Sequence, residues 1–445
     1  MSGLTDDTWS REPVGFRRGE LKGSDGIAVI AVTLIGGPAL IVGAAMVEDH
    51  GLDLLQVLLV APLAALIGGV LIGSSAQMAA KTGANSVWLL RPAFGRWGGW
   101  VVALVRLAMV GLWAVVGLML VGEWGAQAAQ SFGVALPRPV VIGLVAAAGL
   151  AMALAGVVRT TMHVIKRPLF WSSVALMALL AWRMTDSVAF APAGVDGQFW
   201  GALQYATELA VVFVPFVQTV ARRLANEEEA FTSFGVGYTV PATAMLLVGA
   251  VFVGAAGTFP FDLTAIDIGL AGPLFAIAWV VVAEIDQGFS AFVATGSETV
   301  GVIPSVSVIF LGVAGAVGVV VAAVFLADYP IVWASLAAAL AFPAAVIAVA
   351  DFMGVRSLDY PESDIYGIDA GPRFNVAGVV CWLLAVVVGQ LLDPSIDEWV
   401  SDVSRQTDVD LPWRLLAAVA GALIYLITAR QRNRRAVRPH ELRGV

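Results

Sequence analysis

Apolar segments, each about 20 residues long, follow one another along almost the whole chain. The hydrocarbon core of a membrane is about 30 Å thick and takes roughly 20 apolar residues per helix. Of the 445 residues, 59% are hydrophobic and only 13% are charged, whereas soluble domains average about 45–50% apolar and about 25% charged residues. A chain of this composition needs lipid as its solvent, and its loops leave no room for a separate soluble domain.

The pattern predicts an all-α integral membrane protein with about twelve transmembrane helices. The spans are expected at residues 26–48, 54–80, 98–130, 138–157, 167–184, 199–223, 232–257, 270–296, 306–327, 329–353, 374–392 and 411–430. The tails, residues 1–25 and 431–445, are rich in Arg and Lys, so the positive-inside rule places both termini in the cytoplasm. We therefore expect a multi-pass protein of the cell membrane that contacts lipid and acts as a monomer.

Two spans carry helix breakers near their middle. The first has Gly36-Gly37-Pro38, and the sixth, five spans later, has Pro215. Interruptions at corresponding places in two halves are typical of inverted-repeat transporters, whose unwound backbone binds substrate or ions. The alternative is an ordinary kink, because Pro is common in membrane helices.

Three short elements resemble the nucleobase:cation symporter-1 family of purine, cytosine, allantoin and hydantoin permeases. They are Lys81-Thr82-Gly83 followed by Phe94-Gly95, then Ala350-Asp351-Phe352, and the stretch from Ser290 to Gly296. The resemblance implies a 5+5 inverted repeat with discontinuous helices 1 and 6. Residues 26–184 would form the first repeat and residues 199–353 the second, with two added helices over 374–430.

The resemblance also implies one planar heterocycle bound at mid-membrane and coupling to H⁺ or Na⁺. In the eighth span, the family supplies sodium ligands and a substrate amide from Ser/Thr residues followed by Asn. Here the matching stretch is Asp286-Gln287-Gly288. Asp286 and Gly36 are therefore candidates for cation coupling, with Na⁺ near them as one option, and Gln287 is a candidate substrate contact.

Charged residues inside a membrane helix cost about 2.5–3.5 kcal/mol each on insertion scales and default to functional or paired roles. Glu284 and Asp286 are two residues apart, about 200° around a regular helix, so both cannot face one cavity. We favour Asp286 for coupling, with Glu284 as a second candidate; either acid can instead pair with Arg106 or cap a kink. Glu208 can face the substrate, pair with Arg106 or lie at the outer mouth.

Further candidates for substrate binding follow from ring and amide chemistry. Trp113, Phe213 and Phe216 can stack on a flat ring, Gln218 can donate to and accept from its edge, and Gly37 can offer backbone N–H groups. For the aromatic residues, ordinary packing is the competing interpretation.

No enzymatic pattern is present in the sequence. One cysteine and three histidines predict no disulfide, metal cluster or cofactor, and the charge pattern predicts no nucleic-acid partner. The leading hypothesis is a cation-coupled symporter of a nucleobase-like heterocycle working by alternating access. The alternatives are a transporter of the same fold for an amino acid, amine or vitamin precursor, and a membrane sensor that binds a ligand without transport.

Overall fold

The computed structural model describes residues 20–184, 198–256, 272–303, 306–326, 330–361, 365, 373–392 and 411–441. Its α-helices are α1 (Gly23–Leu34), α2 (Gly37–Glu48), α3 (Leu54–Thr82), α4 (Arg91–Ser131), α5 (Arg138–Ala155), α6 (Val157–Thr160), α7 (Phe170–Met184), α8 (Phe199–Ala221), α9 (Glu228–Ala256), α10 (Gly272–Val282), α11 (Ile285–Val302), α12 (Val308–Phe325), α13 (Ile331–Ala350), α15 (Val376–Leu392) and α16 (Trp413–Glu441). A π-helical segment, Thr161–Leu169, joins α6 to α7, and a second, Asp351–Val355, follows α13. Most of residues 1–25, the predicted N-terminal tail, lie outside the described ranges.

The described helices agree with the predicted number of spans. Ten helices, or helices joined end to end, are long and apolar enough to cross a membrane, and the bent pair α1–α2 adds an eleventh. α15 is a further apolar helix of 17 residues. Leu55, Leu144 and Phe310, each more than 60% exposed, lie on the outer surface, as expected where lipid replaces water.

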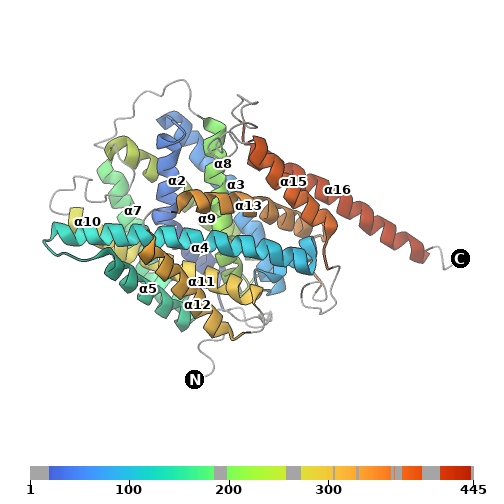
Figure 1. The fold of residues 1–445 in the computed structure, drawn as a ribbon, viewed down its shortest axis with the longest axis horizontal. Helices are drawn as coiled ribbons and strands as arrows, with labels where there is room; N and C mark the ends of the chain where they lie inside the picture. The colour runs from blue at the N-terminus through green and yellow to red at the C-terminus, as the bar shows by residue number, and fades with distance from the viewer. Residues whose placement is uncertain are drawn as a thin grey trace.

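The long helix α4 crosses the face of the molecule seen in Figure 1, and it packs against α5, α11 and α13. Its first turn is set apart from the rest by Gly95, whose φ of +76° lies in the left-handed region that favours glycine. α15 and α16 pair with each other at one end of α4, and α16 continues to Glu441, beyond the predicted end of the last span at residue 430.

Asp351, from the Ala350-Asp351-Phe352 element, fastens these last helices to the rest of the protein. Its buried carboxylate accepts a hydrogen bond from Tyr425 of α16 at 2.7 Å and another from Tyr360 at 2.8 Å. Tyr425 in turn accepts one from Asn375 Nδ2 at 3.3 Å, just before α15. This element therefore has a structural role.

The predicted interruption of the first span is present. α1 ends at Leu34, α2 begins at Gly37, and the two axes differ by 55°. Pro38 stands in the first turn of α2, where its missing N–H costs nothing because the first N–H groups of a helix have no intrahelical partner.

The predicted second break, at Pro215 in the sixth span, is wrong. α8 is one continuous helix through Pro215, and membrane helices tolerate an internal proline where neighbouring groups satisfy the freed backbone. Thr219 Oγ1 also donates to Pro215 O at 2.8 Å. The second interruption lies instead in the eighth span, where Ala283 and Glu284 separate α10 from α11.

Candidate functional site

A narrow cavity lies between the broken first span and helices α4, α8 and α11. It is lined by Pro38, Val110, Trp113, Ala114, Gly117, Leu118, Val212, Phe213, Phe216, Gln287, Ser290, Ala291 and Ala294. No described lining residue is ionisable. Apart from backbone, the polar groups are the Gln287 amide, the Ser290 hydroxyl and the Trp113 indole N–H, so the site suits a small uncharged solute with a polar edge.

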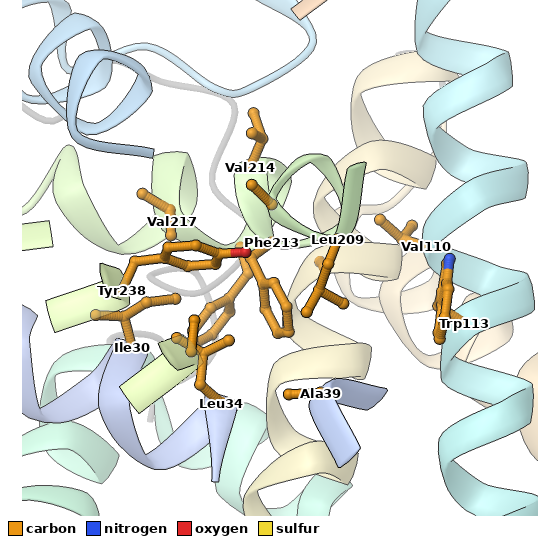
Figure 2. Close-up of a cluster of buried hydrophobic side chains, with 14 of the residues drawn as sticks. Ile30, Leu34, Ala39, Val110, Trp113, Leu209, Phe213, Val214, Val217 and Tyr238 are labelled. Atoms are coloured by element: carbon orange, nitrogen blue, oxygen red, sulfur yellow. The ribbon is translucent and has the colours of Figure 1, made fainter. Parts of the chain in front are cut away.

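Trp113, one of the residues predicted to contact the substrate, lies on the α4 side of this cavity. Figure 2 shows it across the buried cluster from Phe213, with Val110 one turn away on the same helix. Its ring is 4% exposed, and its Nε1 has no hydrogen-bond partner among the described residues. A buried indole N–H without a partner is uncommon and is available to an acceptor on a ligand.

The two phenylalanines of α8 also line the cavity. Phe213 packs edge-on against Tyr238 with ring centroids 6.2 Å apart, and Phe216 packs edge-on against Phe289 at 6.0 Å. These contacts fix both rings in place. Phe213 and Phe216 therefore combine the two roles that the sequence left open, cavity lining and core packing.

Behind the cavity, the interruptions of the first and eighth spans meet. Glu284 Oε1 accepts hydrogen bonds from Gly37 N at 2.8 Å and from Trp279 Nε1 at 3.0 Å. Glu284 thus caps the N-terminus of α2, where a negative charge is stabilised by the helix dipole. Of the alternatives considered for this acid, capping a break is the one present.

Gln287 and Asp286 follow at the start of α11 and contact the other side of the break. Gln287 Nε2 donates to Thr33 O at 2.5 Å, and a Cβ added to Gly36 would lie 2.6 Å from that nitrogen. Asp286 is 0% exposed, and the groups beside its oxygens are the Thr33 hydroxyl and the backbone N–H groups of Asp286 and Gln287, none of them in hydrogen-bond geometry. The fold therefore brings five of the candidate residues together at the break: Gly36, Gly37, Glu284, Asp286 and Gln287.

Arg106 does not pair with any of the acids proposed for it. It binds Glu298, with Nη2 2.9 Å from Oε1, and it also donates to Gln218 Oε1 at 3.1 Å. Ser86 Oγ donates to the same Glu298 oxygen at 2.6 Å. Gln218 is thus part of a buried network and is not among the cavity-lining residues, which corrects its predicted contact with the substrate.

The sequence analysis did not single out Glu298. The sequence did mark this residue, because a glutamate inside an apolar span has the same unfavourable free energy of insertion as Glu284 and Asp286. What the sequence lacks is the partner, because Arg106 and Glu298 are 192 residues apart.

Glu208 lies beyond the opposite end of the cavity, about 15 Å along α8 from Gln218. Its Oε2 is 3.2 Å from Arg414 Nη1 at the start of α16. It does not line the main cavity, and together with Trp113, Tyr205 and Ser335 it borders a smaller hollow. Glu208 therefore pairs with Arg414, and the alternative pairing with Arg106 is wrong. The cavity lies between the Glu208–Arg414 pair and the Arg106–Glu298 pair.

Comparison with known proteins gives similarity in structure without similarity in sequence. No family model matches the chain, and no curated protein sequence matches it. Among solved structures, the closed conformation of Mhp1, a nucleobase-cation-symport-1 family transporter with bromovinylhydantoin bound, matches with a TM-score of 0.76 at 15% identity and 95% coverage of both chains. The chain has a transporter fold.

Two other solved structures share the fold. The inward-facing conformation of Mhp1 matches with a TM-score of 0.67 at 16% identity, covering 96% of this chain and 94% of that one. A substrate-bound, outward-open Na⁺-coupled sialic acid symporter gives 0.62 at 12% identity, covering 96% and 92%.

Proposed function

We propose that this protein is a secondary active transporter that carries a small, uncharged, planar nitrogen heterocycle across the cell membrane together with a cation. The observation that carries the proposal is the cavity beside the broken first span, in which Trp113 faces Phe213 and Gln287 and Ser290 offer the polar edge. The similarity of fold to a nucleobase-cation-symport-1 family transporter supports cation-coupled transport. An enzyme is not proposed.

The cavity favours a neutral ring over an amine. A cationic solute would need a carboxylate in contact with it, because an unpaired buried charge is costly. The described lining contains no carboxylate; Glu284 and Asp286 lie behind Gln287, at the break. We assign substrate contact to Trp113, Phe213, Phe216 and Gln287, with Gly37 presenting the start of α2 beside Pro38.

The acids at the break support coupling to a cation, H⁺ or Na⁺. Two carboxyl groups without an ion pair among the described residues require compensating positive charge. Binding of substrate and cation in one closed state, followed by opening toward the other side, gives symport by alternating access. The protein would act as a monomer with both termini in the cytoplasm.

Uptake into proteoliposomes tests the proposal. Labelled cytosine, uracil, hypoxanthine, allantoin, a hydantoin and a thiamine precursor would each be driven by a pH gradient or by a sodium gradient. We expect accumulation of at least one ring compound, and loss of about 2- to 10-fold in its affinity in Trp113→Ala, from the roughly 0.5–1.5 kcal/mol of an aromatic contact.

Trp97→Ala is the matched control, since Trp97 lies on the same helix but is 45% exposed on the outer surface. It should leave uptake unchanged. No uptake of any compound by folded protein would refute the heterocycle assignment while leaving the fold intact.

A further inference from the structure

We infer that Asp286 carries a proton as the coupling ion, and that the Gln287 amide takes the place that an alkali cation occupies at a broken helix. This inference rests on the proposed function and deepens it by naming the ion. It follows from how the backbone groups at the break of the first span are satisfied and from the surroundings of the two acids beside it.

Each of the last four carbonyls of α1 already accepts a hydrogen bond from the protein. The last four carbonyls of a helix lack intrahelical partners, and in broken-helix transporters such carbonyls coordinate Na⁺. Here Ile35 N donates to Ala31 O at 3.1 Å and Val32 O at 3.0 Å, and Gly36 N donates to Leu34 O at 2.9 Å. The remaining carbonyl, that of Thr33, accepts from Gln287 Nε2 at 2.5 Å.

The space beside these carbonyls is filled as well. The Gln287 amide packs against Gly36 so closely that a Cβ there would lie 2.6 Å from Nε2. A neutral N–H donor thus stands where a bound cation would satisfy the backbone. The residues at this break do not fit a sodium ion.

The two acids differ in what surrounds them. Glu284 Oε1 has two N–H donors and lies at the N-terminus of α2, all of which stabilise a carboxylate. Asp286 is fully buried. The groups beside its oxygens are backbone N–H groups of Asp286 and Gln287, not in hydrogen-bond geometry, and the Thr33 hydroxyl, which donates to Val29 O; the charged group that faces it is Glu284. A second carboxylate here would be unpaired and repelled, so Asp286 holds a proton in the closed state.

Within the described residues, no other charged group on the helices packed against α11 compensates Asp286. The helices that pack against α11 are α1, α4, α5, α8, α10 and α12. Their buried or partly buried charged side chains are engaged elsewhere: Asp25 with Lys166, Arg91 with Ile365 O, Arg106 with Glu298, Glu123 with Gln127, Arg138 with Ala323 O, and Glu208 with Arg414. Arg106 and Glu298 interact 12 residues along α11 from Asp286, about 18 Å away.

The proton leaves when the cavity opens. Water reaching the start of α11 stabilises the Asp286 carboxylate, and the O–H bond breaks with the proton passing to that water. After the empty protein has reopened to the other side, reprotonation there restores the neutral form that the solute-loaded closed state requires. One proton therefore moves with each solute.

Two measurements on the purified protein need no substrate. Radioactive sodium should show no saturable binding at constant ionic strength. Infrared spectroscopy at neutral pH should show the C=O band of a protonated carboxyl that disappears in Asp286→Asn and persists in the matched variant Glu284→Gln. Saturable sodium binding by the unmodified protein, or a band lost only in Glu284→Gln, would overturn the inference.

Transport adds a third test. Asp286→Asn should keep exchange of labelled solute across the membrane and lose accumulation driven by a pH gradient. If it still accumulates solute under the pH gradient, Asp286 is not the proton carrier. If no heterocycle is transported, the proposed function is refuted but this inference is not, because sodium binding and infrared spectroscopy test the coupling ion without a substrate. Should Asp286→Asn fold poorly, sodium binding by the unmodified protein remains decisive.

Discussion

Replacing Glu298 by alanine should destabilise the protein by about 3–5 kcal/mol, because the change leaves a buried arginine without its counter-charge. Arg106 is 2% exposed and Glu298 is 0% exposed, and Arg106 Nη2 lies 2.9 Å from Glu298 Oε1 in a buried ion pair. Without Glu298, Arg106 keeps Gln218 Oε1 at 3.1 Å and the weak contact with Ser86 O at 3.5 Å. Neither of these partners carries charge.

A double-mutant cycle separates the pair from its surroundings. Unfolding of purified protein would be measured for Glu298→Ala, for Arg106→Met and for the two together. The double variant should be less destabilised than the sum of the two single variants, because removing both charges leaves neither one buried alone. Glu298→Gln should fall between the unmodified protein and Glu298→Ala, since its amide oxygen can still accept from Arg106 and Ser86.

Glu123→Ala is the control on α4. Glu123 accepts a hydrogen bond from Gln127 one turn later at 3.1 Å, an interaction worth about 0.2–0.5 kcal/mol. If Glu298→Ala is as mild as Glu123→Ala, or if the two single changes simply add, the argument that these charges support each other in a dry interior fails.

Three further outcomes follow from the packing. Gly43→Ala should lower the free energy of unfolding by about 1–3 kcal/mol, because the added Cβ would clash with Leu246 O where α2 meets α9. Gly111→Ala is the control and should be neutral, since no neighbouring atom lies within 4 Å of its added Cβ; equal effects of the two changes would contradict the close approach of α2 to α9. Tyr425→Phe removes one of the two hydroxyl donors to Asp351 and should cost about 1.5–3 kcal/mol, a prediction refuted if the variant melts like the unmodified protein. Pro215→Ala should preserve uptake, because α8 is already continuous at this position; loss of uptake without loss of folding would show that a break at Pro215 is needed.

Hydropathy was enough to predict most of the fold. Segments of about 20 apolar residues can satisfy their backbone in lipid only as helices, and Gly36-Gly37-Pro38 marks a break because glycine and proline favour a helix end and a helix start there. Trp113 could be picked out from the sequence as a candidate, since an aromatic ring in a membrane span can stack on a flat substrate. The rule that buried acids have a specific role also picked out Asp286 and Glu284.

The sequence by itself therefore determined which segments cross the membrane, where the first span breaks, and which charged side chains have a high free-energy cost of burial. Only the tertiary structure decided which of those side chains meet. It paired Arg106 with Glu298 rather than with Glu208 or Asp286, kept α8 continuous through Pro215, and placed the second interruption at Glu284. The reason is physical: span formation depends on local hydropathy, whereas the partner of a buried charge or an open carbonyl is whatever group packing brings within about 3 Å, often from a helix hundreds of residues away.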